Sequence, residues 1–189
     1  MIRFSVALVS LLLAAAVEPA AVGRPAPDFT AVDESGAKYE LSQYRGKAVV
    51  LEWTNPDCPF VARHYSADTM EKLATTLDAS EVVWLAVNST HYNTPEDTKA
   101  WKTEQGFGYP TLQDPDGTLG HAYGARTTPH LFVIDAHGVL RYAGAIDDDP
   151  SGKSPAPTSY VGNAVATLLA SGTPDPSETK PYGCSVKYK

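Results

Sequence analysis

The stretch "VVLEWTNPDCPFVARHY", residues 49–65, decides the fold that this sequence predicts. Its first part is a nearly continuous apolar run, which is typical of a strand covered on both faces of a sheet. After a polar turn, Pro59 favours the start of a helix, because proline at the first helical position loses no hydrogen bond. Cys58 precedes this proline, so it is expected outside the helical region, at the N-cap.

A cysteine at this junction favours nucleophilic chemistry. The unpaired N–H groups at the start of a helix, and the positive end of its dipole, stabilise the thiolate relative to the thiol. The thiolate is the form that attacks disulfides and peroxides. The alternative is that Cys58 is a small buried apolar side chain, as free cysteines often are. Its position between Asp57 and Pro59 favours the chemical role.

The composition limits the classes of partner. The chain has 189 residues, of which 43% are apolar, and this suits one domain with a core. A formal net charge of −7 argues against binding to nucleic acid or to anionic lipid. The 2 cysteines, Cys58 and Cys184, are too few to staple a small domain. We therefore expect a small-molecule or protein partner, and thiols that are available for chemistry.

Residues 1–21 have the pattern of a signal peptide. Arg3 precedes an apolar run from Phe4 to Val17, and small residues follow. This run is shorter than the roughly 20 residues that a helix needs to cross a bilayer. We expect an exported chain, periplasmic or secreted, with no stable membrane insertion after cleavage. Such compartments are oxidising, which suits disulfide chemistry.

Strands and helices alternate along the rest of the chain, which predicts an α/β fold with a central mixed sheet and helices on both faces. Residues 22–172 form the predicted domain, and residues 173–189 form a proline-rich tail that carries Cys184. The predicted elements are a hairpin at "DESG" within 23–47, a strand over 48–53, a helix from Pro59 to about Asp78, a strand over 81–88, a helix from Thr94 to Gly106, a short strand at "YPTLQD", a short helix or turn at "GTLGHAYGA", a hairpin over 130–146 and a helix over 159–171.

The segments "PAPDFTAVDESGAKYELSQYRGKAVVLEWTNPDCPF" and "TTPHLFVIDAHGVLRYAGAI" resemble parts of thioredoxin-fold redoxins. This group includes the peroxiredoxins (the alkyl hydroperoxide reductase and thiol-specific antioxidant type) and periplasmic thiol–disulfide oxidoreductases. The resemblance covers most of residues 23–171. It implies a thioredoxin-like three-layer sandwich that closes with a β hairpin and a helix, and an oxidoreductase or antioxidant activity without a cofactor.

The resemblance also implies roles for single residues. Cys58-Pro59-Phe60-Val61 occupies the place of a Cys-x-x-Cys motif, with Cys58 as the attacking cysteine and Val61 at the position of the resolving one. Pro129 matches the cis-proline of thioredoxins, and Thr128 the residue whose backbone pairs with substrate. An ordinary trans proline at the start of a strand is the alternative for Pro129.

The sequence departs from peroxiredoxins at the positions that polarise a peroxide. Read against Cys58, the hydroxyl position holds Asn55 and the proline position holds Leu51. The position of the distant arginine falls at Pro129. In addition, the peroxide-reactive cysteine aligns with Val61. We therefore expect the fold of a peroxiredoxin without efficient peroxidase activity.

Cys184 is the candidate for the missing second thiol. An attacking cysteine forms a mixed disulfide and needs another thiol for its release. The extended tail from Ser171 to Cys184 spans roughly 40 Å, which is enough to reach the start of the Cys58 helix. Cys184 could resolve Cys58 or hold it as a resting disulfide. It could also be a static staple of the tail, or stay unpaired.

Four other side chains are candidate contributors to the site. Trp53 is expected to pack behind the active-site turn and to help position the substrate. His130 could face the thiolate or a metal, or lie on the surface. Asp57 and Asp147 could oppose the helix dipole and limit the fall of the Cys58 pKa, although the loop with Asp147 could also be simply solvated. A copper site of the two cysteines and a histidine is chemically allowed, but no ligand spacing demands it, so no metal is predicted.

These observations leave three functions open. The first is an exported thiol–disulfide oxidoreductase that acts on a protein or small-molecule disulfide or thiol, with an external reductant. The second is a weak thiol peroxidase that works through a sulfenic acid at Cys58. The third is a binding module that keeps the redoxin scaffold for a metal or protein partner and has lost turnover.

Overall fold

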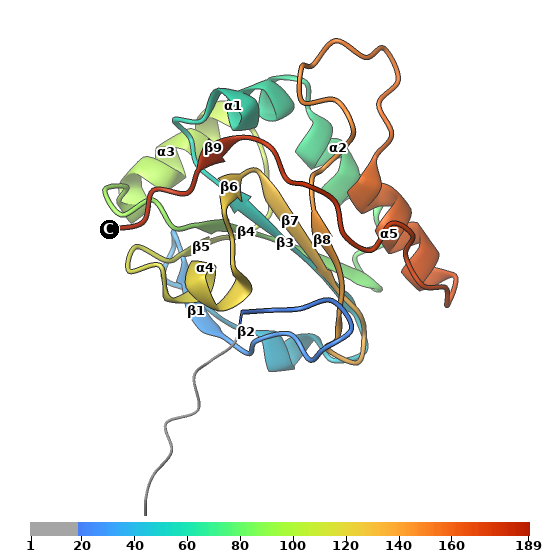
Figure 1. Cartoon of the computed structure of the whole chain (residues 1–189). Helices are drawn as coiled ribbons and strands as arrows, with labels where there is room; N and C mark the ends of the chain where they lie inside the picture. The colour runs from blue at the N-terminus through green and yellow to red at the C-terminus, as the bar shows by residue number, and fades with distance from the viewer. Residues whose placement is uncertain (1–18) are drawn as a thin grey trace, which may run out of the picture.

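The computed structural model describes residues 19–189 (Figure 1). The predicted signal peptide, apart from its last three residues, lies outside the described part of the chain. Among residues 19–189, no helix has both the length and the apolar character needed to cross a membrane.

A seven-stranded mixed sheet runs through the molecule in the order β2-β1-β5-β4-β3-β7-β8. Its middle strands β5, β4 and β3 are parallel, and antiparallel strands extend it at both sides. Every residue of β3 is buried, as the apolar run predicts. The strands are β1 (Thr30–Asp33), β2 (Lys38–Glu40), β3 (Ala48–Thr54), β4 (Val82–Asn88), β5 (Thr111–Gln113), β7 (His130–Ile134) and β8 (Leu140–Gly144).

Helices cover both faces of this sheet and give it two separate cores. One core contains side chains of α1, α2, α3 and α5, and the other contains side chains of η1 and α4. Neighbouring residues of β3 enter different cores, Val50 the first and Val49 the second. This confirms the predicted three-layer sandwich. The helices are η1 (Leu41–Tyr44), α1 (Pro59–Ser66), α2 (Thr69–Thr76), α3 (Pro95–Gln105), α4 (Thr118–Tyr123) and α5 (Tyr160–Leu169).

The helix predicted from Pro59 to about Asp78 is wrong in its continuity, because the chain breaks between α1 and α2. Asp68 adopts a left-handed conformation with φ +53°, which a short polar side chain tolerates better than most. The apolar stripe nevertheless faces one core across the break, since Val61, Tyr65 and Met70 are all buried.

The tail after α5 contains a strand that the sequence did not predict. In Figure 1 the tail runs from α5 along β8 and then passes between α1 and α4. There β9 (Cys184–Ser185) pairs antiparallel with β6 (Thr127–Thr128), in a small sheet separate from the main one. The described tail is not helical, as its prolines predict.

Candidate active site

Cys58 lies where the sequence predicts, at the N-cap of α1. Its backbone is extended, with φ −87° and ψ 118°, and its carbonyl accepts the first helical hydrogen bond, from Ala62 N–H at 2.9 Å. The turn before it is held by its own N–H, which donates to the Asn55 carbonyl at 3.0 Å. Only 1% of Cys58 is exposed. The thiol is therefore fixed at the positive end of the helix and covered.

Thr128 and Pro129 lie against this thiol. The peptide bond between them is cis, as the resemblance to thioredoxins implies. The Cys58 Sγ lies 2.9 Å from the Thr128 carbonyl oxygen, to which the thiol donates. The segment that the resemblance assigns to substrate pairing is thus in direct contact with the predicted nucleophile.

Cys184 reaches the same place from the other end of the chain. In the pairing of β6 with β9 it lies opposite Thr128. Both cysteines are free thiols, and Cys184 packs against the core cluster that contains Cys58. The tail therefore reaches the start of α1, as its length allows, and brings the two thiols of the chain to the same site.

The two thiols have opposite pKa shifts. Burial raises the pKa of Cys58, but hydrogen bonds from the Cys184 thiol and the Val61 N–H outweigh this, so the net pKa is lowered. We assign no lowering to Thr128, because its hydroxyl has no hydrogen-bond partner and its carbonyl favours the protonated thiol. Burial raises the pKa of Cys184 to about 11, and the neighbouring Cys58 thiolate acts in the same direction. Cys58 is the more acidic of the two thiols.

Trp53 packs in the core, as expected of it, and His130 does not lie on the surface. Trp53 is 0% exposed and lies in the core that does not contain Cys58, where its indole N–H donates to Ser89 at 3.0 Å. It supports the turn from behind and cannot touch a substrate. His130 is buried rather than on the surface, and its Nδ1 accepts the Arg126 N–H at 3.3 Å. Burial, with a contribution from the Arg126 charge, lowers its pKa to about 3, so it stays neutral and is not a cationic partner of the thiolate.

Asp57 and Asp147 each accept a hydrogen bond from a tyrosine hydroxyl. Asp57 is exposed and accepts a hydrogen bond from the Tyr92 hydroxyl at 3.1 Å. Asp147 is buried, so the expectation of a solvated loop is wrong at this position, and its carboxylate accepts from the Tyr182 hydroxyl.

The sequence analysis missed the cluster that holds the tail beside the site. Tyr182, two residues before Cys184, has its hydroxyl 3.0 Å from His64 Nε2. Arg63 donates to the Asp149 carbonyl at 3.0 Å and to the Tyr182 hydroxyl at 3.4 Å. Burial, and to a lesser degree the Arg63 charge, lowers the pKa of His64 to about 4. No pattern in the sequence links the tail to α1, so only the structure reveals this contact.

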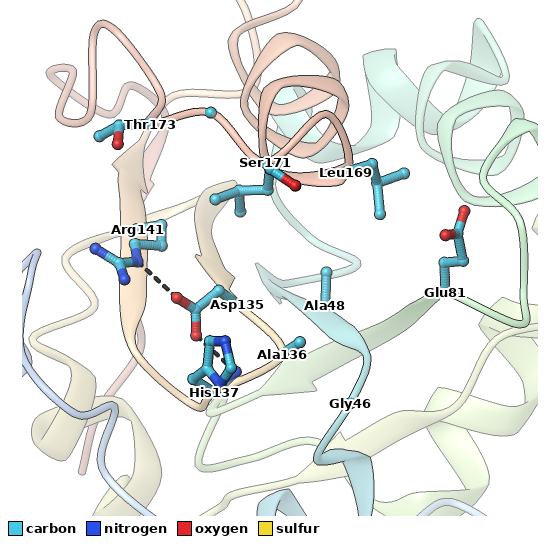
Figure 2. Close-up of a pocket in the computed structure, with 12 residues that line it drawn as sticks. Gly46, Ala48, Glu81, Asp135, Ala136, His137, Arg141, Leu169, Ser171 and Thr173 are labelled. Atoms are coloured by element: carbon cyan, nitrogen blue, oxygen red, sulfur yellow. Dashed lines mark hydrogen bonds and ion pairs between the residues drawn. The ribbon is translucent and has the colours of Figure 1, made fainter.

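Among residues 19–189 there is no cluster of metal ligands at the thiol pair, and the cavity drawn in Figure 2 lies away from it. Within residues 19–189, no three His, Cys, Asp or Glu side chains are placed to hold a metal ion, so the copper alternative has no third ligand there. Figure 2 shows a cavity of about 470 Å³ bordered by Ala48 and by the Asp135–Arg141 ion pair. Ala48 begins β3 and Cys58 follows its end, so the length of that strand separates the cavity from the thiols.

Comparison with known proteins identifies the family. The AhpC/TSA family matches residues 22–143. The chain belongs to the AhpC/TSA family. Peroxiredoxin-2 of Cricetulus griseus is 36% identical over 156 residues, which cover 70% of this chain and 73% of that protein. This confirms the resemblance to redoxins drawn from the sequence.

Solved structures agree on the fold of this AhpC/TSA chain. A hypothetical protein of Sinorhizobium meliloti 1021 superposes with a TM-score of 0.81 and 26% identity, over 91% of this chain and 97% of that one. A secreted disulfide oxidoreductase of Mycobacterium tuberculosis shares the fold at a TM-score of 0.52 and 22% identity, over 59% of this chain and 79% of that one. Together with the peroxiredoxin relatives, these identify a thioredoxin-fold redox enzyme.

Proposed function

We propose that this enzyme is a thiol–disulfide oxidoreductase in which Cys58 attacks and Cys184 resolves. The observation that carries the proposal is the position of Cys184 opposite Thr128, whose carbonyl contacts Cys58 Sγ, in a pair of thiols with one lowered and one raised pKa. Such a pair assigns the roles, because the thiol with the lower pKa is the one present as thiolate at neutral pH.

The first step is attack on the substrate. The Cys58 thiolate attacks one sulfur of a substrate disulfide, forms a mixed disulfide and releases the other substrate sulfur as a thiolate. The helix N-terminus stabilises the reacting thiolate before attack. The Thr128 carbonyl, which accepts from the thiol in the resting state, loses this partner when the new bond forms.

The second step depends on a change in Cys184. Burial raises the pKa of Cys184 most, and the neighbouring Cys58 thiolate raises it further, a contribution that is lost once Cys58 is in a mixed disulfide. The pKa of Cys184 then falls toward its ordinary value, and its thiolate attacks Cys58 Sγ. This forms the Cys58–Cys184 disulfide and releases the second substrate thiolate. The substrate has gained two electrons, and an external dithiol restores the enzyme.

The same cycle can run in reverse and oxidise a substrate dithiol. Which direction operates depends on the reductant or oxidant in the compartment. The signal-like residues 1–21 support export to the periplasm or beyond, where both directions occur. The substrate is a protein or small-molecule disulfide or thiol.

The test is turnover of a model disulfide by the Cys58→Ser and Cys184→Ser variants. We expect Cys58→Ser to lose activity completely. Cys184→Ser should stall as a mixed disulfide between Cys58 and one half of the substrate, and mass spectrometry should detect this adduct. Full activity of Cys58→Ser would exclude the mechanism, and unchanged turnover of Cys184→Ser would remove the resolving role.

Membership of the AhpC/TSA family supports a second candidate, a weak thiol peroxidase. The peroxide would oxidise the Cys58 thiolate to a sulfenic acid and leave as water or alcohol, and Cys184 would condense with the sulfenic acid to a disulfide. The position that carries a hydroxyl in peroxiredoxins holds Asn55, so this activity should be slow. A peroxide turnover that equals or exceeds disulfide turnover would make the peroxidase the primary function.

A further inference from the structure

Residues 177–188, here called the strap, bind several elements around the two thiols. At its start, Ser177 and Thr179 exchange backbone hydrogen bonds with Ala143 of β8, each 3.1 Å. Near its end, the Val186 N–H donates to the Arg126 carbonyl at 3.1 Å. Between these points lies β9, against β6. Figure 1 shows this course along β8 and on to β6.

Two tyrosines anchor the strap on either side of Cys184. The Tyr182 hydroxyl donates to the buried Asp147 and contacts His64. Tyr188 stacks on His121 of α4, with ring centroids 4.2 Å apart, and donates to the Ala125 carbonyl at 2.8 Å.

Glycines make room for the strap. On α4, a Cβ at Gly120 would overlap the Tyr188 ring, so this helix position leaves space for the anchor. On the strap itself, Gly183 has φ +139°, and a Cβ there would overlap the Thr128 carbonyl oxygen. The close approach of the strap to β6 therefore requires glycine directly before Cys184.

The strap closes the site. Cys58 is only 1% exposed, and the strand position opposite Thr128 is taken by Cys184. An attacking thiolate must meet the substrate sulfur in line and at close range, which a covered side chain cannot do. The backbone that the family resemblance assigns to the substrate is thus already paired within the chain.

We propose that the strap occupies the place of an extended substrate segment, and that it must leave β6 before a disulfide-bearing polypeptide can reach Cys58. This inference rests on the proposed function, because it describes access to the same nucleophile. Opening needs the loss of a two-residue strand pair, of the backbone hydrogen bonds that flank it and of one or both tyrosine anchors. Such local opening costs much less than global unfolding.

The experiment measures access to Cys58 in a Cys184→Ser background, where only Cys58 can react. The rate of alkylation by iodoacetamide is followed against pH up to its plateau, because the plateau reports access and the midpoint reports the pKa. Gly183→Ala and Tyr188→Ala are added separately, and they act on different parts of the strap. Gly36→Ala is the matched control: Gly36 also has a positive φ, +86°, but a Cβ there meets nothing within 4 Å.

We expect the plateau to rise at least about tenfold in Gly183→Ala and Tyr188→Ala, because a side chain at such a φ, or the loss of an anchor, favours the open strap. Gly36→Ala should not change it. Equal plateaus in all variants would overturn the proposal, and so would an equal rise in Gly36→Ala. The assay contains neither Cys184 nor turnover, so its outcome is separate from that of the resolving role.

Discussion

Cys184 lies directly opposite Thr128 in an antiparallel pair, although each strand has only two residues. The Thr128 carbonyl in turn contacts Cys58 Sγ at 2.9 Å. One residue of β6 therefore touches both the nucleophile and the segment that carries the second thiol. This arrangement gives a chain without a Cys-x-x-Cys motif the two cysteines that a disulfide cycle needs.

The Cys184 thiol should be measurable in the acidity of Cys58. We predict that Cys184→Ala raises the pKa of Cys58, since it removes the neighbouring donor that stabilises the Cys58 thiolate. The pH dependence of alkylation in the reduced protein measures this shift. Cys184→Ser keeps a hydroxyl donor and should give a smaller shift. An unchanged pKa in the alanine variant would show that the thiols do not interact.

A cysteine at position 61 should replace the tail as resolver. Val61 is buried in the first turn of α1, three residues after Cys58. We predict that Val61→Cys restores turnover to the inactive Cys184→Ser variant through a disulfide between Cys58 and the introduced thiol, at a stability cost of about 1 kcal/mol. Val61→Ala in the same background is the control and should stay inactive. No rescue would mean that Cys58 is not in the geometry of a Cys-x-x-Cys motif.

Glu52 should make stability depend on pH. This carboxyl is fully buried on β3 and accepts hydrogen bonds from Trp84 at 2.8 Å and Tyr65 at 2.9 Å. Burial raises its pKa to about 7 from an ordinary value of 4.5, although the hydrogen bonds oppose this. Folding therefore takes up a proton between these values. The contribution of Glu52 to the free energy of unfolding is fully present below pH 4.5 and is lost as the pH rises through 7.

We predict that Glu52→Gln removes this dependence, which amounts to up to about 3 kcal/mol. Urea unfolding of wild type and variant at several pH values between about 4 and 8 gives the difference. Glu81→Gln on the exposed surface is the control. A constant difference between wild type and Glu52→Gln across this range would contradict the buried titration.

His130 should make the stability of the protein depend on pH in the opposite direction from Glu52. Its pKa is lowered to about 3 from an ordinary value of 6.5, so the unfolded chain binds the proton first as the pH falls. Its contribution to stability is present above pH 6.5 and is lost progressively below it. We predict that His130→Asn, which keeps an acceptor for the Arg126 N–H, loses less stability between about pH 7 and 5 than the wild type does. The exposed His137→Asn serves as control, and a loss as large as the wild type's would refute the prediction.

Much of the fold followed from local patterns in the sequence. The apolar run of β3, Pro59 behind Cys58 and the capping residues of α3 each act over a few residues, so the sequence alone places Cys58 at the start of α1. The break at Asp68 carries no such signal, because a left-handed conformation at a residue other than glycine is decided by packing.

The half of the site contributed by the tail could not be predicted in detail. The length of the tail allowed Cys184 to reach Cys58, but a two-residue strand has no periodicity, and its pairing with β6 depends on contacts far away in the sequence. Asp147 and His64 are both buried where the Tyr182 hydroxyl contacts them, so the burial of Asp147 also depends on a segment far away in the sequence.

The most direct test of the cycle is to map the disulfides formed during reaction. The reduced protein is treated with one equivalent of a small-molecule disulfide, quenched in acid, alkylated without reduction and digested for mass spectrometry. We predict a Cys58–Cys184 peptide pair in the wild type, and a mixed disulfide at Cys58 in Cys184→Ser. If Cys58 of the wild type stays in a mixed disulfide with the substrate while Cys184 is alkylated, the two-cysteine mechanism is contradicted.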